Sequence, residues 1–153
     1  MDSFQASGGF ILRSATSADA KAIRRLINLV KINPTGLSWK RFTLAVDRDG
    51  TIIGCGQVKP HKDGTLELAS IAVQPQWRGR GVARSIIEHL LDLHPGRLYL
   101  TCRSPLEPLY QKFGFQAIEY AEMPPYFQQI SRLVALYNKL YHQPDHLSVM
   151  RRN

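Results

Sequence analysis

The chain has few cysteines, no long apolar run and no block of like charge. Its 153 residues include only two cysteines, Cys55 and Cys102, both in strand-like runs. No set of cysteines and histidines has the spacing of a zinc site, so we expect no metal and two buried thiols without a disulfide. No apolar run approaches the roughly 20 residues of a membrane helix, and residues 1–9 lack the regions of a signal peptide. We therefore expect a cytoplasmic protein with no membrane partner.

Positive charge is in excess, because 20 lysines and arginines face 12 acidic residues and give a net charge of +8. Such a chain favours anionic partners, among them nucleic acids and phosphorylated ligands. The charges are scattered rather than gathered in runs of five or more, and no motif combines basic and aromatic residues for nucleic acid. A nucleic-acid partner is therefore not expected. A basic surface that only aids solubility is the alternative.

Regular elements are predicted along nearly the whole chain, without a repeat, a low-complexity segment or a linker. We expect one domain at 1–153, with a core at about 8–120 and a C-terminal helix and short last strand within 124–152. Helical spacing of apolar residues predicts helices at 20–30, 82–93, 105–113 and 125–140. Short apolar runs predict strands at 10–12, 42–46, 51–58, 66–73, 98–102, 115–120 and 147–150.

The turns between these elements indicate how the strands pair. Residues 47–50 and 61–64 have the composition of hairpin turns, so the three strands from 42 to 73 should be antiparallel. The strand at 66–73, the helix after it and the strand at 98–102 form a βαβ unit, whose strands run parallel. The prediction is an α/β (α+β) fold with a mixed sheet. Gly54 and Gly56 within one strand indicate a bulge or the close approach of another group.

The loop after the strand at 66–73 has the features of a phosphate-binding site. Gly79 and Gly81 carry no Cβ, and the next helix directs its unbonded N–H groups and positive dipole end toward them. Arg78 and Arg80 add charge. A P-loop would need Gly-Lys-Ser/Thr, which is missing. Arg84 stands where the dinucleotide fingerprint needs a third small residue.

The remaining pattern is Gln76-Trp77-Arg78-Gly79-Arg80-Gly81-Val82-Ala83, after a strand that ends in Val-x-Pro. It resembles the GNAT superfamily of acyl-CoA-dependent N-acyltransferases. Pro108-Leu109-Tyr110-Gln111-Lys112-Phe113-Gly114-Phe115 resembles a second segment of that family. The resemblance implies a sheet of about six to seven strands, largely antiparallel with a central splayed parallel pair, flanked by helices. It also implies direct transfer of an acetyl group from acetyl-CoA to a primary amine.

The resemblance implies which residues hold the cosubstrate. Backbone N–H groups of the loop would bind the CoA pyrophosphate, and those of the preceding strand the pantetheine arm and thioester carbonyl. Many members have Asn and a small residue where this chain has Arg103 and Leu106, which makes Ser104 a candidate replacement. The predicted cofactor-binding residues are Ile71, Ala72, Val73, Arg78, Gly79, Arg80, Gly81, Val82, Ala83 and Ser104.

Two residues are predicted to be catalytic. Glu67 matches the general base of several family members, and regular alternation would place it on one face with Ala69, Ile71 and Val73. The alternative for Glu67 is a solvated side chain. His61 is a weaker candidate base, with an exposed turn histidine as its alternative. Tyr110 matches the tyrosine near the CoA sulfur, where a phenol with an ordinary pKa near 10 can donate to the leaving thiolate. Its alternative is a core tyrosine.

Two functions therefore remain open. The first is an acetyl-CoA-dependent N-acetyltransferase, and the second is a GNAT-like module that senses CoA or binds a partner without catalysis. The amine is not specified, and its groove would be built from residues 32–42 and 123–137. A homodimer, common in the family, also stays open, and the long helix after Pro125 is a candidate for covering the groove or for an interface. Tyr126, Phe127 and Tyr137 are expected in the core or an interface.

Overall fold

The computed structural model describes residues 4–6 and 8–153, which divide into two units. Within the described residues, the first unit runs to Lys59 and continues over Leu68–Pro95. The second unit comprises Pro60–Glu67 and Gly96–Asn153. The boundaries cut through two strands, after Lys59 in β4 (Ile52–Pro60) and after Glu67 in β5 (Leu66–Val73), so each unit receives part of both.

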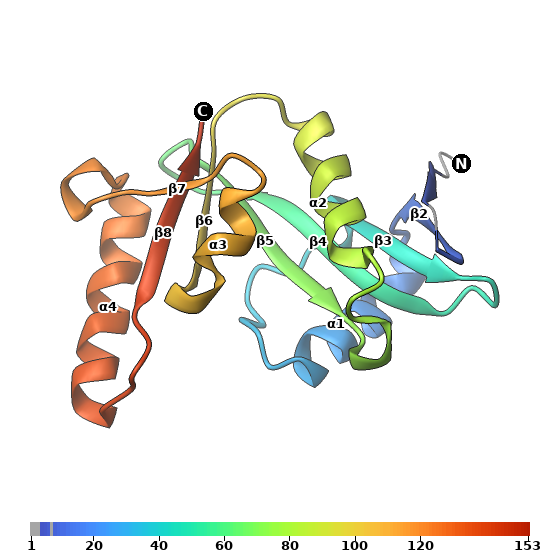
Figure 1. Ribbon diagram of the computed structural model, residues 1–153, viewed down its shortest axis with the longest axis horizontal. Helices are drawn as coiled ribbons and strands as arrows, with labels where there is room; N and C mark the ends of the chain where they lie inside the picture. Colours follow the sequence, from blue (N-terminus) through green and yellow to red (C-terminus); the bar gives the residue numbers. More distant parts are fainter. Residues whose placement is uncertain (1–3, 7) are drawn as a thin grey trace. The chain divides into compact units, whose positions relative to one another are not determined.

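The strands of the first unit follow one another in chain order (Figure 1). The pairs β1 with β2, β2 with β3, and β3 with β4 are antiparallel. Residues 47–50 form the predicted hairpin turn, because the Asp47 side chain accepts the N–H groups of Asp49 and Thr51 at 2.9 Å each. The strands are β1 Phe4–Ala6, β2 Phe10–Ser14, β3 Phe42–Asp47, β4 Ile52–Pro60 and β5 Leu66–Val73.

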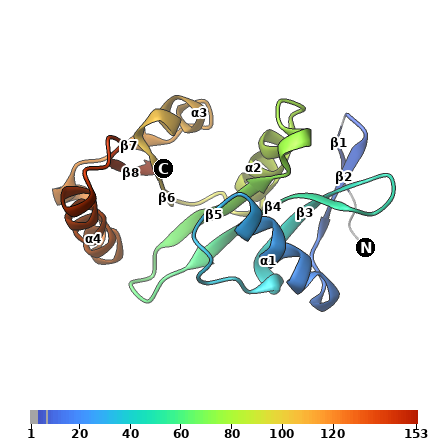
Figure 2. The ribbon, with the colours of Figure 1, turned by 90° about the horizontal axis from the view of Figure 1, so that it is seen from below.

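Two helices cover opposite faces of these strands, α1 (Ala20–Leu29) and α2 (Val82–Leu93) (Figure 2). The buried face of α1 packs against Cys55 of β4 and its neighbours. On the other face, a Cβ on Gly54 would lie 2.7 Å from Val82 Cγ1, and one on Gly56 would lie 2.7 Å from Ile86 Cγ2. The predicted close approach at these glycines is therefore confirmed, and the approaching group is α2.

The start of α1 is fixed by an ion pair with β2. The Asp19 carboxylate accepts the Thr16 N–H at 2.7 Å and both terminal nitrogens of Arg13 at 2.8 and 2.9 Å. Arg13 bonding holds the pKa of Asp19 down at about 2, against the opposing effect of burial. Thr16 and Asp19 form a capping box around a 3-10 turn at Ser17–Asp19, directly before α1.

Strand β5 is not regular. Ser70 has φ of +60°, in the left-handed region that non-glycine residues rarely adopt. Its Oγ accepts a hydrogen bond from the Gln57 amide at 2.8 Å, and its carbonyl lies 3.5 Å from Cys55 Sγ. The alternation predicted from Glu67 to Val73 is therefore wrong, because the period of two does not continue through Ser70.

The second unit contains β6 (Leu98–Arg103), β7 (Gln116–Ala117) and β8 (Leu147–Arg152). Strand β8 pairs antiparallel with both β6 and β7. Glu67 of β5 pairs in parallel with Tyr99 of β6, which confirms the parallel pair expected of the βαβ unit. The described residues thus form eight strands, largely antiparallel, and the mixed fold class is confirmed.

Two helices complete the second unit, α3 (Glu107–Gln111) and α4 (Pro125–Tyr141). Phe127 of α4 packs in a buried cluster with Tyr99 of β6 and Val149 of β8. Phe127 is therefore confirmed as a core residue, whereas Tyr137 is 55% exposed. The strand predicted at 115–120 is much shorter, because Tyr120–Glu122 turns into a 3-10 helix. Among the described residues, no helix has both the length and the hydrophobicity to cross a membrane.

Candidate active site

The predicted phosphate loop is anchored where β5 ends. The Gln74 N–H donates to the Ile53 carbonyl at 2.8 Å, and its side-chain amide donates to the Ile52 carbonyl at 2.9 Å. A 3-10 turn at Pro75–Trp77 follows, and α2 begins at Val82. The loop therefore spans the short distance between a fixed strand end and a helix N-terminus.

Two glycines give this loop its backbone course. Gly79 has φ of +78° and Gly81 has φ of +81°, and a Cβ on either would meet no atom within 4 Å. Glycine is therefore needed for conformation and not for space. Gly81 is the N-cap of α2 and makes no side-chain cap bond. The first N–H groups of α2 have no partners within the helix, so with the helix dipole they form the geometry of an anion site.

The arginines around the loop differ in their contacts. The Arg80 guanidinium lies 4.8 Å from the centre of the Trp77 ring, and Trp77 itself meets Phe10 edge-on at 6.4 Å. Arg84 pairs with Glu88 one turn further along α2, at 3.4 Å. Arg78 and Arg80 are both exposed at the loop. These two residues therefore place positive charge beside the anion geometry, while Arg84 is directed along the helix.

The second candidate region is in the second unit, around Glu67. His61 Nε2 lies 2.8 Å from Glu67 Oε1, and the two side chains are only 10% and 7% exposed. The Tyr126 ring stacks on the imidazole with centroids 3.5 Å apart, and Phe127 meets it edge-on at 5.8 Å. The expectation of an exposed turn histidine is therefore wrong, because α4 covers the turn. A solvated Glu67 is equally inconsistent with this burial.

Asp63 connects the same turn to the start of α4. One of its oxygens accepts the Tyr126 N–H at 3.1 Å, and the other accepts both the N–H and the hydroxyl of Thr65. Desolvation acts to raise the pKa of Asp63, but these bonds outweigh it and the pKa is lowered. A carboxylate at the positive end of a helix is also stabilised by the helix dipole. The hairpin turn is thus tied to α4 by backbone and ring contacts.

Tyr110 lies on α3, with its ring 6.4 Å from that of the fully buried Phe115 in an edge-on contact. Burial, and then the neighbouring Cys102, raise the pKa of Tyr110 to about 12. The expectation of an ordinary pKa near 10 is corrected upward. The phenol is therefore neutral and able to donate at every pH at which the protein would be assayed.

The positions that depart from the family pattern have local partners. Arg103 forms an ion pair with Asp145 at 2.6 Å and is largely exposed. The Ser104 N–H donates to the His146 carbonyl at 3.0 Å. Leu106 is 45% exposed. Arg103 is thus accounted for by the segment that leads into β8, and nothing in the structure explains Leu106.

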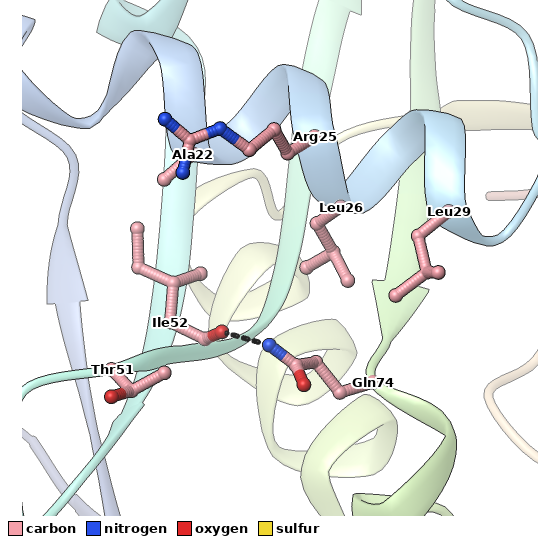
Figure 3. A pocket seen from close by; sticks show the side chains of 7 residues that line it. All are labelled: Ala22, Arg25, Leu26, Leu29, Thr51, Ile52 and Gln74. Atoms are coloured by element: carbon pink, nitrogen blue, oxygen red, sulfur yellow. Dashed lines mark hydrogen bonds between the residues drawn. The ribbon is translucent and has the colours of Figure 1, made fainter.

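A pocket of the first unit lies between α1, β4 and the end of β5 (Figure 3). Leu26 and Leu29 point into it from α1, while the Arg25 side chain runs along the helix toward Ala22. Its volume of about 210 Å³ is below the roughly 300 Å³ at which ligand pockets begin, and the Gln74 amide is already bonded to Ile52. We assign it no ligand.

The pairing of Glu67 with His61 is the feature that sequence reasoning missed. Its signal was present, because His61 begins the hairpin turn at 61–64 and bonds the Thr65 carbonyl across it, which makes Glu67, two positions further on, its diagonal neighbour. Within the described residues, no group of three or more His, Cys, Asp or Glu side chains could hold a metal ion. Cys55 and Cys102 are buried free thiols, as expected.

The sheet and the helices that cover it agree with a family model. The model described as the acetyltransferase (GNAT) domain matches residues 39–117, just over half of the chain. The chain belongs to the GNAT acetyltransferase family.

Two curated relatives carry the names cysteine-rich protein 2-binding protein from Mus musculus and Homo sapiens. They are 32% and 33% identical over 88 residues, which are 55% of this chain and 11% of each relative. The chain therefore spans about a tenth of the length of these relatives.

Solved structures share the fold. N-acetylglutamate synthase from Neisseria gonorrhoeae, complexed with coenzyme A and N-acetyl-glutamate, superposes with a TM-score of 0.72 at 20% identity, over 96% of this chain and 35% of that one. Rv2747 from Mycobacterium tuberculosis, in complex with CoA and NLQ, gives 0.69 at 22% identity, over 92% and 97%. At these identities the likeness concerns the fold.

Proposed function

We propose that this chain is an acetyl-CoA-dependent N-acetyltransferase that moves an acetyl group directly to a primary amine. The observation that carries the proposal is the loop before α2, with Gly79 and Gly81 at positive φ and the open N-terminus of α2 behind them. Membership of the GNAT family and the coenzyme A bound to related folds support the same cosubstrate. In the reaction the amine nitrogen attacks the thioester carbon, an amide bond forms, and CoA leaves as a thiolate.

The cosubstrate would be held mainly by backbone. In the proposed mode, the N–H groups of residues 78–83 bind the pyrophosphate, with Arg78 and Arg80 supplying charge. The N–H groups of Ile71, Ala72 and Val73 bind the pantetheine arm and stabilise negative charge on the carbonyl. Ser104 is the proposed side-chain contact to pantetheine.

Glu67 is the proposed general base. An amine is a nucleophile only after it loses a proton, and a buried carboxylate beside the reacting group can take that proton directly or through one water. Tyr110 is the proposed donor to the departing thiolate, a role that its raised pKa supports because the phenol stays protonated. We further propose a cytoplasmic location, with nucleic acid not a partner and a homodimer as an assembly state to be tested by light scattering.

Calorimetric titration with acetyl-CoA tests the cosubstrate. Saturable binding is expected, and Gly81→Ala should weaken it because an alanine at φ of +81° shifts the loop backbone. Gly50→Ala is the matched control, since Gly50 also has φ of +81° but lies in the turn between β3 and β4. An affinity that falls equally in both variants, or no binding at millimolar acetyl-CoA, would contradict the proposal.

Thiol release with a panel of amines tests the reaction. The panel begins with glutamate, because a related fold belongs to N-acetylglutamate synthase, and extends to other amino acids, polyamines and peptides with free N-termini or lysines. Acetyl-CoA binding without transfer to any amine would favour the alternative function, a module that senses CoA without catalysis.

A further inference from the structure

His61 has no role in the proposed reaction, but its contact with Glu67 suggests one. A carboxylate only accepts hydrogen bonds, so the 2.8 Å separation between His61 Nε2 and Glu67 Oε1 requires a hydrogen on Nε2. The neutral imidazole is therefore the Nε2–H tautomer. This bond fixes the direction of the Glu67 carboxylate through a residue only six positions away.

The imidazole is itself held in place by α4. Tyr126 lies parallel to it with an interplanar angle of 16°, and Phe127 closes its edge at 86°. Tyr126 is positioned through its backbone by Asp63, as described above. Asp63 thus holds Tyr126, Tyr126 holds the imidazole of His61, and His61 contacts the Glu67 carboxylate. The side chains of His61 and Glu67 are both largely buried.

Two titratable groups that interact with this pair lie on the hairpin turn and on α4. Asp63 lies on the same turn and interacts electrostatically with His61, and Tyr126 of α4 is influenced by both Glu67 and Asp63. Burial first, and then these two carboxylates, raise the pKa of Tyr126, so its hydroxyl stays neutral.

We propose that His61 is a positioning residue for the general base, which donates its Nε2–H to Glu67 Oε1 and holds the carboxylate aimed at the acceptor amine. The inference rests on the proposed function, because it acts through Glu67. Holding the carboxylate in place matters because a misplacement of about 1 Å can lower the rate about 100-fold.

The experiment compares His61→Ala and His61→Gln with the wild type and with Lys62→Gln, an exposed neighbour in the same turn. His61→Ala should lower kcat about 10- to 100-fold with acetyl-CoA affinity unchanged. His61→Gln keeps an N–H donor and should recover most of the rate. In a Glu67→Gln background, His61→Ala should have no further effect.

Three outcomes would overturn the inference. They are an unchanged kcat in His61→Ala, no recovery in His61→Gln, and full additivity with Glu67→Gln. If His61→Ala does not fold, the nitrogen-15 spectrum of the imidazole still decides, because a neutral Nδ1–H tautomer of His61 in the wild type would remove the bond. Failure of the proposed function looks different, since the wild type would then transfer no acetyl group while the Nε2–H tautomer persisted.

Discussion

Tyr110 shows how burial changes the role that a side chain can take. Its pKa of about 12 lies well above that of an ordinary thiol, about 8.5. Complete transfer of the phenol proton to a CoA thiolate would therefore be uphill by about 3.5 pKa units, or about 5 kcal/mol. We infer that Tyr110 donates a hydrogen bond to sulfur as the C–S bond breaks, and that solvent supplies the proton afterwards.

Tyr110→Phe should lower kcat about 10- to 1,000-fold, as expected for the loss of one donor to developing charge. Acetyl-CoA affinity should remain, because the bond forms only as the thiolate leaves. Below about pH 11 the wild-type rate should show no alkaline limb from this phenol. Steady-state kinetics and calorimetry provide the measurements, with Tyr120→Phe, an exposed tyrosine, as control. An unchanged kcat would remove Tyr110 from the mechanism.

At the scale of elements, α1 depends on a buried ion pair with β2. The pKa of Asp19 is lowered from 3.8 to about 2, chiefly by bonding to Arg13. A lowered pKa means that the folded protein binds the proton less tightly than the unfolded chain. The stabilisation is therefore present above pH 3.8 and is lost as the pH falls to about 2.

Asp19→Asn should accordingly reduce the free energy of unfolding by about 2 kcal/mol at pH 7. The difference from the wild type should shrink as the pH falls below 4. Urea unfolding followed by circular dichroism at a series of pH values gives both results. Asp49→Asn, in the exposed hairpin turn, should change the stability by less than about 0.5 kcal/mol. A deficit in Asp19→Asn that stays constant down to pH 2 would show that the pair is not its source.

The approach of α2 to β4 depends on a missing side chain. A Cβ at Gly56 would lie 2.7 Å from Cγ2 of Ile86. This methyl group is attached to the Cβ of a fully buried side chain, so it cannot swing aside. Gly56→Ala should therefore destabilise the protein by about 1–3 kcal/mol through overpacking. Gly96→Ala is the control, since a Cβ there meets nothing within 4 Å. Thermal unfolding that is equal in the two variants would contradict the packing argument.

At the scale of the whole molecule, the boundaries between the two units cut through β4 and β5. The boundary in β5 falls between Glu67 and Leu68, and both residues are buried. Separate unfolding would break β5 at two adjacent buried residues and expose both. We therefore propose that the chain behaves as a single domain.

Differential scanning calorimetry should accordingly show one transition, with equal calorimetric and van't Hoff enthalpies. Acetyl-CoA at about 100 times its Kd should shift this transition upward as one peak, with about 2.7 kcal/mol of added stability. Two separable transitions, of which acetyl-CoA moves only one, would show instead that the units are independent domains.

Local features of this chain could be predicted from its sequence because their causes lie within a few residues. Gly79 and Gly81 adopt positive φ in a loop that leads into α2, and Thr16 with Asp19 begins α1. The hairpin turns and the parallel pair follow from element lengths and turn composition. In each case the hydrogen bonds or steric limits that decide the structure are formed by near neighbours.

The candidate site was decided by contacts between distant residues. His61 looked like an exposed turn residue, and it is buried because Tyr126, 65 positions later, stacks on it. The left-handed Ser70 accompanies a hydrogen bond from Gln57, which no periodic pattern in β5 reveals. The sequence by itself determined the family, the loop and the elements, since these depend on local chemistry. Only the tertiary structure, through burial and long-range pairing, decided the surroundings of Glu67 and Tyr110.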